Sequence, residues 1–193
     1  MRHLVMVCLL VMSFTLVPVV VCNAGLAPLG LINIGAKADY IRFTDDLFKD
    51  TDLDKGAYFG LEANTILLPF LYLGLEAGYV NIDGSVGNVD TELTYIPMEL
   101  NAKFAISPVG NIVMDIGGGV SANYAKLKGT VDDISVSEDD VLFGGQFFAD
   151  INYTRSIFFI GINGKYQISE KGIKKYDVDL NNWRVGGQIG VTF

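Results

Sequence analysis

The chain has 193 residues, half of them hydrophobic, and its 22 Asp and Glu outnumber its 14 Lys and Arg. The net charge of −8 argues against nucleic acid as a partner and against attraction to anionic lipid headgroups by charge alone. Gly occurs 22 times, which is too often for a helical protein because Gly is costly in helix interiors.

The N-terminus has the composition of a secretory signal peptide. Met1-Arg2-His3 is a weakly basic start, Leu4 to Val21 is an apolar run, and Ala24 is a small residue suited to the position before a cleavage site. We therefore predict a cleavable signal peptide over residues 1–24 and a single domain over residues 25–193.

Two other interpretations of this N-terminus remain open. The apolar run could be an uncleaved membrane anchor. Cys22 could be the lipidated residue of a lipoprotein, although Val21 stands where such signals carry a small residue. Cleavage after Ala24 would remove Cys8, Cys22 and the only histidine, His3, so that the mature chain has no thiol, disulfide or imidazole.

From Gly30 onward the residues alternate with period two, which indicates β-strands. Each segment is close to the ~10 residues that a tilted transmembrane strand requires. In chain order, the eight alternating segments are 32–40, 57–64, 71–79, 96–106, 112–124, 143–153, 158–168 and 183–193.

The connections between these segments alternate in length. Short turns are expected at 67–70, 107–111 and 154–156. Long polar loops are expected at Arg42–Lys55, Asn81–Thr91, Lys126–Asp140 and Ser169–Asp179. This layout is typical of an outer-membrane barrel with extracellular loops and both termini in the periplasm. We predict an all-β fold, an eight-stranded antiparallel up-and-down transmembrane β-barrel in the outer membrane of a Gram-negative-type bacterium.

Alternation alone does not say which face points outward, because a soluble lipocalin-like barrel also has eight strands, with the apolar face inside. The distribution of aromatic residues favours the membrane, since aromatic girdles mark both membrane interfaces. Toward the long loops lie Tyr40, Tyr79, Tyr124, Phe143, Tyr166 and Trp183, and toward the turns lie Phe70, Tyr153, Phe158 and Phe193. The polar face is also rich in Gly, which suits a crowded interior.

The face assigned to the interior carries ten ionisable residues: Lys37, Asp39, Glu62, Glu76, Glu99, Lys103, Asp115, Asp150, Lys165 and Arg184. Such charges must pair, because unpaired buried charge is expensive. The favoured interpretation is a structural plug of salt bridges, since polar filling is normal for this architecture. The alternative is a proton path, a narrow ion channel or an acid–base site. Four bulky residues narrow the lumen further: Tyr58, Tyr72, Phe148 and Phe159.

We expect neither an enzyme nor a cofactor-binding protein. Without a mature histidine the His-dependent catalytic groups of barrel hydrolases cannot be assembled. Asp50–Asp54 resembles the start of a calcium loop, but Lys55 stands where Gly is needed and Leu61 where Glu is needed, so no metal site is predicted there. The acidic third loop could still bridge to lipopolysaccharide phosphates through divalent cations.

The eight segments, the strand Ile96–Phe104 and the ending Gly187–Phe193 resemble the OmpX and opacity-protein group of small OmpA-like outer-membrane barrels. The resemblance covers roughly Gly30 to Phe193. It implies that a terminal Phe after alternating apolar residues is a recognition signal for the barrel-assembly machinery. The matching residues here are Ile189, Val191 and Phe193.

Members of that group serve as adhesins, envelope stabilisers or small pores, so the resemblance does not choose among these roles. We expect a structural, adhesive or surface-interaction role through the four long loops, because eight strands leave little lumen once side chains fill it. A small ion-conducting pore is the alternative. The expected partners are outer-membrane lipid, lipopolysaccharide and, during biogenesis, the assembly machinery, with the barrel as a monomer.

Overall fold

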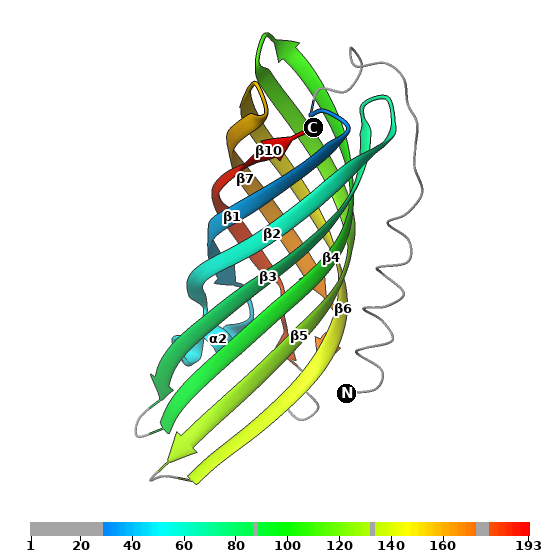
Figure 1. The fold of residues 1–193 in the computed structure, drawn as a ribbon. Coiled ribbons are helices and arrows are strands. Elements are labelled where there is room, and N and C mark those ends of the chain that lie inside the picture. The colour runs from blue at the N-terminus through cyan, green and yellow to red at the C-terminus, as the bar shows by residue number, and fades with distance from the viewer. Residues whose placement is uncertain (1–28, 87–88, 132–133, 173–177) are drawn as a thin grey trace.

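The computed structural model describes residues 29–86, 89–131, 134–172 and 178–193. The predicted signal peptide lies outside these residues. Eight long antiparallel strands form a closed barrel in the order β1-β10-β7-β6-β5-β4-β3-β2, which confirms the predicted fold (Figure 1). The strands are β1 (Ile32–Phe43), β2 (Lys55–Leu68), β3 (Leu71–Val86), β4 (Val89–Val109), β5 (Ile112–Val131), β6 (Ile134–Arg155), β7 (Phe158–Ser169) and β10 (Asn182–Thr192).

Three short elements complete the fold at the loop end of the barrel. Helix α2 (Asp46–Asp50) follows β1, and β8 (Lys171–Gly172) pairs with β9 (Val178–Asp179) in the connection between β7 and β10. Asp45 caps the helix, since its side chain accepts a hydrogen bond from the backbone N–H of Leu47 at 2.9 Å. In the described part of the chain, no helix has the length and apolar character needed to cross a membrane.

The strands direct their apolar face outward and their polar face into the barrel. On β1, Ile34 is 48% exposed whereas Lys37 is 4% exposed, and the burial alternates along the whole strand. Exposed Leu, Ile, Val and Phe cover the outside of the other strands as well. The lipocalin-like alternative, which would bury this apolar face, is therefore wrong.

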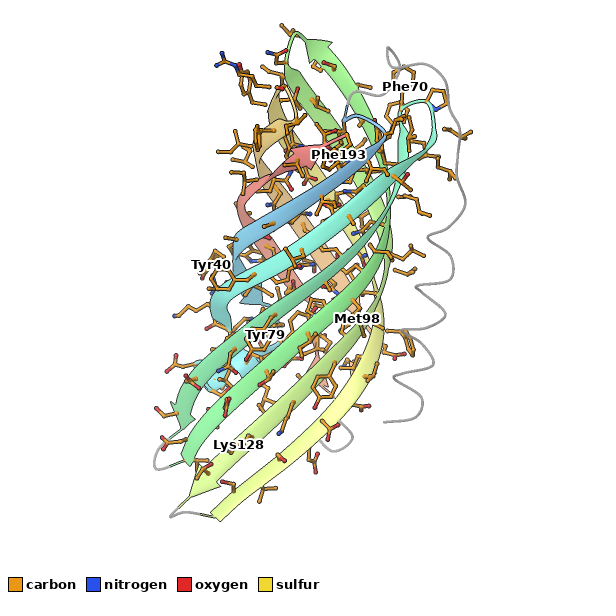
Figure 2. The ribbon with its side chains drawn as sticks, in the orientation of Figure 1. Tyr40, Phe70, Tyr79, Met98, Lys128 and Phe193 are labelled. Carbon is orange, nitrogen blue, oxygen red and sulfur yellow. The ribbon has the colours of Figure 1, made fainter. Side chains whose placement is uncertain are left out.

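Aromatic residues flank the apolar outer band at both ends. Tyr40 and Tyr79 lie toward the loop end, while Phe70 and Phe193 lie at the turn end (Figure 2). The ring centroids of Tyr40 and Trp183 are 5.4 Å apart. About ten residues separate Trp183 from Phe193, which is about 33 Å along the strand and about 25 Å along the barrel axis at a tilt near 40°. That height matches the apolar band of an outer-membrane barrel.

Two of the predicted long loops are mainly strand. β3 and β4 continue through most of 81–91, and β5 and β6 continue through most of 126–140. The prediction of loops at Asn81–Thr91 and Lys126–Asp140 was wrong because polar residues occur on a water-exposed strand as well as in an irregular loop. A strand in water also carries a polar outer face, and the alternation persists there: Leu93 is buried while its neighbours Glu92 and Thr94 are partly exposed.

The result is a four-stranded extension, formed by β3, β4, β5 and β6, that projects beyond the rest of the barrel at the loop end (Figure 1). At the opposite end the strands are joined by tight turns. β2 and β3 are separated only by Pro69 and Phe70, and Phe70 has a φ of 68°. The short turns predicted from the sequence are confirmed.

Candidate functional site

The barrel interior contains a continuous network of ion pairs at mid-height. Lys37 Nζ lies 2.8 Å from Glu76 Oε2 and 2.9 Å from Glu62 Oε2. Lys165 Nζ lies 2.8 Å from the same Glu76 oxygen and also contacts Glu99. Glu62, Glu76 and Glu99 each contact at least two cations. Positive and negative side chains therefore alternate across the lumen.

Arg184 on β10 completes the centre of this network. Its guanidinium contacts Glu99 on β4, and its Nη1 lies 3.7 Å from Glu76 Oε1 on β3. The ring of Tyr58 packs 4.4 Å from the guanidinium carbon, and the Tyr58 hydroxyl donates to Glu76 Oε1 at 2.6 Å. Because Arg184 is fully buried, these partners replace part of the water that its charge would otherwise require, while its Nε and Nη1 have no hydrogen-bond partner among the described residues.

A second part of the network lies closer to the turn end. Lys103 Nζ is 2.7 Å from Glu62 Oε1, 3.6 Å from Asp150 Oδ2 and 4.0 Å from Asp115 Oδ1. Asp115 and Asp150 face each other directly across β5 and β6. Asn152 Nδ2 donates to Asp115 Oδ2 at 3.2 Å, whereas neither oxygen of Asp150 has a hydrogen-bond partner among the described residues.

All ten predicted interior residues are buried, and salt bridges within 4.0 Å join all of them except Asp39. Asp39 instead accepts a hydrogen bond from Asn163 Nδ2 at 2.9 Å. The side chain of Phe148 fills space between two of the cations, with its ring centre 5.7 Å from Lys103 Nζ and 5.4 Å from Lys165 Nζ. That the network serves as a structural plug of the barrel stays a prediction.

Neutral polar side chains, which were not among the ten predicted interior residues, extend the network. Gln167 Nε2 donates to Asn123 Oδ1 at 2.6 Å and to Ser121 Oγ at 2.8 Å, while its Oε1 accepts from the Tyr95 hydroxyl at 2.8 Å. In the same way, Gln146 Nε2 donates to Asn101 Oδ1 at 2.8 Å. These residues share the inward position along their strands, and that signal was available in the sequence.

An apolar plug closes the loop end of the lumen. Its centre is the ring of Phe43, 5.1 Å from Phe48 on α2 and 5.3 Å from Tyr95 on β4. Phe48 is 1% exposed although it lies in a segment predicted as a polar loop. The buried plug residues are Ile41, Phe43, Phe48, Leu53, Tyr58, Val80, Ile82, Leu93, Tyr95, Ala125, Leu142, Val178 and Leu180.

Backbone hydrogen bonds hold the plug-forming segments over the barrel mouth. Phe43 N donates to Asp54 O at 2.6 Å, and Thr44 N donates to Asn181 O at 2.9 Å. These bonds connect the ends of the first loop to each other and to the last connection. Arg42–Lys55 and Ser169–Asp179, predicted as long polar loops, thus also contain buried apolar residues, since Phe48, Leu53 and Val178 lie in the plug.

A smaller apolar cluster fills the turn end. Leu29, Ile66, Tyr72, Ala105 and Val113 are buried together there. The backbone N–H of Leu29 donates to the Tyr72 hydroxyl oxygen at 3.1 Å, which places Leu29 inside the barrel opening. Three layers of buried side chains, apolar, ionic and apolar, thus occupy the lumen.

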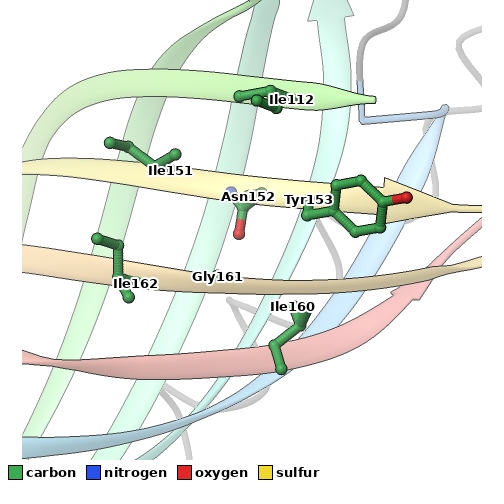
Figure 3. A pocket seen from close by; sticks show the side chains of 7 residues that line it. All are labelled: Ile112, Ile151, Asn152, Tyr153, Ile160, Gly161 and Ile162. Carbon is green, nitrogen blue, oxygen red and sulfur yellow. The ribbon is translucent and has the colours of Figure 1, made fainter. Parts of the chain in front are cut away.

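The outer face of the turn half carries a shallow groove of about 390 Å³ across β5, β6 and β7 (Figure 3). Its lining is almost entirely apolar, and it faces away from the lumen. The lining residues are Ile112, Ile151, Asn152, Tyr153, Ile160, Gly161 and Ile162.

The loop end carries mostly acidic charge on its surface, with a few ion pairs. Lys49 Nζ lies 2.8 Å from Asp46 Oδ1 on α2 and holds the pKa of that exposed carboxyl below its usual value. Lys128 Nζ lies 3.9 Å from Glu92 Oε2 on the outer face of the extension. Such exposed pairs contribute little to stability.

The three residues of the predicted assembly signal lie on or directly after the last strand. Ile189 and Phe193 are exposed on the outer face, and Val191 pairs with Ile34 of β1 where the barrel closes. Phe193 N donates to Ile32 O at 2.8 Å. The strand that would carry the signal is thus also the strand that closes the barrel.

No protein-family model matches the chain, and no curated protein matches it in sequence. Solved structures match over most of its length. Neisserial surface protein A (NspA) has a TM-score of 0.62 at 13% identity, with 84% of this chain and 97% of that chain covered. OprG, an outer membrane protein from Pseudomonas aeruginosa, has a TM-score of 0.60 at 14% identity, covering 89% and 99%.

Ail, the attachment invasion locus protein of Yersinia pestis, has a TM-score of 0.58 at 16% identity, with 83% of this chain and 98% of that chain covered. At these identities the likeness concerns the fold. The chain has the fold of the small eight-stranded outer-membrane barrels, as the resemblance to the OmpX and OmpA-like group implies.

Proposed function

We propose that the chain is an integral outer-membrane protein that acts by surface interaction through the extension of β3–β6 and the loops beside it, and not as an enzyme. The exposed apolar band between two aromatic girdles supports the membrane location. The names of two structural neighbours, a surface protein and an attachment invasion locus protein, agree with a task at the cell surface. The mature chain begins at Gly25 in this proposal, with the turns in the periplasm and the extension outside the cell.

The observation that carries the proposal is the pair of free strand edges on the extension. The last pair between β2 and β3 is Tyr58 with Val80, so the rest of β3 has a neighbour only in β4. On the other side, pairing between β6 and β7 begins at Gly144 with Ser169, and the backbone of Phe143 bonds to Glu170. Within the described residues, only the part of β6 before Asp140 therefore pairs with β5 alone. Unpaired edge N–H and C=O groups are able to pair with an extended segment of another protein.

The filled lumen argues against the ion-conducting alternative. An ion would have to pass the apolar plug around Phe43, the buried network around Glu99 and the cluster around Tyr72. Each of the two apolar layers is a dehydrated barrier to a charge.

The test is to shorten both hairpins of the extension in expressing cells, replacing residues 83–90 and 128–137 by two-residue turns. We expect attachment of these cells to one another and to cultured epithelial cells to fall to the level of cells without the protein. The matched control replaces Asp83 and Lys128 by Ser in the full-length chain, which keeps both edges. Cell fractionation and N-terminal sequencing of the mature chain establish location and processing in the same cells.

Equal attachment with and without the extension would contradict the proposed interaction.

In planar bilayers we expect no stable conductance. Conductance steps that change in Lys103→Ala or Glu99→Ala barrels would instead favour the pore.

A further inference from the structure

We propose that the free edge of β6, Ser135–Asp139, binds an extended segment of a partner protein in which an apolar residue and a Lys or Arg stand two positions apart. The cation of this segment meets Glu138, and its apolar side chain meets Val136. The inference rests on the proposed surface interaction. It names the edge that is used and the chemistry that this edge recognises.

Of the two edges of the extension, the edge on β6 is the more open one. The start of β2 lies beside β3, since a Cβ atom added at Gly56 would come within 2.7 Å of the Ile82 side chain. A Cβ atom added at Gly84 would likewise lie 2.5 Å from Thr51 O. A strand added to β3 would therefore displace the first loop, whereas no described strand pairs with β6 before Asp140 on the side away from β5.

The free edge of β6 lacks the residues that usually prevent the addition of a strand. Over Ser135–Asp139 it contains neither Lys nor Pro. Its pairing with β5 continues toward the tip of the hairpin, as far as Ile134 with Val131, so the edge is already extended (Figure 1). Only the partner segment therefore has to become ordered on binding, which favours the association.

Val136 supplies an exposed apolar contact on this edge. It is 67% exposed and shares a face of β6 with Leu142, which is buried in the plug. Opposite Val136 on β5 stands Gly129, where an added Cβ atom would meet, among the described residues, only Val89 Cγ1 at 3.7 Å. Because the surface beside Val136 is low, an apolar side chain of an added strand can extend across it.

Glu138 supplies the charge. It follows Val136 by two positions and therefore lies on the same face. Its Oε2 is buried and has no hydrogen-bond partner. Lys126 and Lys128 leave the opposite face of β5, because Leu127 between them is the cross-strand partner of Glu138. A buried carboxylate oxygen without a donor is costly, and a Lys or Arg of the partner segment would supply that donor.

The charge of the extension favours a basic segment over a second copy of this chain. The free edge of β6 carries Asp139 in addition to Glu138, and the edge of β3 carries Asp83. Two copies that met edge to edge would bring like charges together, which opposes pairing. The chain as a whole has a net charge of −8, so a basic segment is attracted before contact.

The test uses the purified full chain in lipid nanodiscs and a synthetic extended peptide of Ser and Thr, with one Val and one Lys two positions apart at its centre. We expect the largest NMR amide shifts over Ser135–Asp139. Glu138→Gln should weaken binding about tenfold, the effect of one hydrogen bond to a charged group. Glu138→Lys should reverse the preference, so that a peptide with Glu in place of Lys binds better.

The matched control is Asp139→Asn, which removes the same charge from the next residue, on the opposite face, where Lys126 is its cross-strand partner. It should bind the Lys peptide as the wild type does, and circular dichroism checks that every variant folds. No binding of the Lys peptide, equal binding of the Lys and Glu peptides to the wild type, or shifts over Asn81–Ser85 instead would overturn the inference.

The hairpin deletions separate this inference from the proposed function. If shortening the hairpins abolishes attachment of the cells while the peptides are not discriminated, the surface interaction stands and the chemistry assigned to the β6 edge is wrong. If attachment persists after shortening, the proposed function fails, and the inference that rests on it fails with it.

Discussion

At the scale of single residues, the interior charges are stable because each cation has more than one anion beside it. Glu99 receives both Lys165 and Arg184, and its side chain is fully buried. Removing one member of such a buried group leaves charges without partners, which is costlier than never having placed them there. The free energy lost on removing one of these residues should therefore rise with the number of buried charges that lose a partner.

Glu99→Ala should destabilise the barrel by about 3–5 kcal/mol, because two buried cations would then depend on Glu76 alone. Urea unfolding in lipid vesicles, followed by the fluorescence of Trp183, measures this free energy. Glu92→Ala is the control, since its pair with Lys128 is partly exposed and should be worth less than about 1 kcal/mol. Similar losses for the two variants would show that the network does not hold the fold together.

Asp150→Asn should behave in the opposite way. Asp150 faces Asp115 across the strands, and like charges in that position destabilise a sheet by up to about 1 kcal/mol. Lys103 keeps Glu62 at 2.7 Å after the change. We expect an unchanged or higher free energy of unfolding in the same urea assay. A loss as large as that of Glu99→Ala would mean that Lys103 needs this second carboxylate.

At the scale of elements, one strand passes through two environments. The outer face of β3 is apolar from Leu73 to Tyr79, where lipid is expected, and polar at Asn81, Asp83 and Ser85, where water is expected. The hydrogen-bonded pairing with β4 continues through both parts. The environment, and not the secondary structure, thus sets which substitutions β3 tolerates.

Leu73→Arg should cost up to about 2–4 kcal/mol of stability in lipid, because it places a charge within the apolar band. Asp83→Arg lies on the same strand and the same face, beyond Tyr79, and should change stability little. Reversible unfolding in vesicles compares the two. If Asp83→Arg were the more harmful variant, the proposed position of the membrane would be wrong.

Helix α2 is held mainly by the apolar plug. Phe48→Ala should release the first loop while the strands stay folded, because the lost contacts are local and the barrel hydrogen bonds do not depend on them. We expect trypsin to cleave at Lys49 at least tenfold faster in intact cells. Leu67→Ala, an exposed residue at the turn end, is the control and should leave cleavage at Lys49 unchanged.

At the scale of the whole molecule, closure joins the first strand to the last. β10 pairs with β1 over Asn33–Phe43, so the barrel is complete only after its final segment has been placed. Closure removes two exposed sheet edges within the membrane band, where unpaired backbone groups are most costly. A signal on β10 would therefore let the assembly machinery recognise the strand whose insertion completes the barrel.

Deleting Phe193 should lower the amount of protein in the outer membrane and increase its degradation in the periplasm, if Ile189, Val191 and Phe193 form the assembly signal. The folded barrel should lose little stability, since the Phe193 ring is exposed. Quantitative blotting of cell fractions, together with urea unfolding of the refolded variant, separates assembly from stability. Unchanged outer-membrane levels would contradict the assembly role.

The amino-acid sequence by itself determined the number of strands, the short turns and which face of each strand is apolar. These features are local, because a period of two assigns every residue to a face without knowledge of its partners. The inward position of all ten ionisable residues followed from this alternation once the lipid-facing side was inferred from the aromatic girdles.

Only the tertiary structure decided which interior charges meet and how the loop end is closed. Lys165 and Glu99 lie on strands that are not neighbours, and their contact depends on the tilt and stagger of the closed barrel. Phe48 looked like part of a polar loop because its burial requires a cavity that exists only after the strands close. The extension of β3–β6 was missed because water favours polar residues on a strand surface and in a loop alike, so polarity could not separate the two.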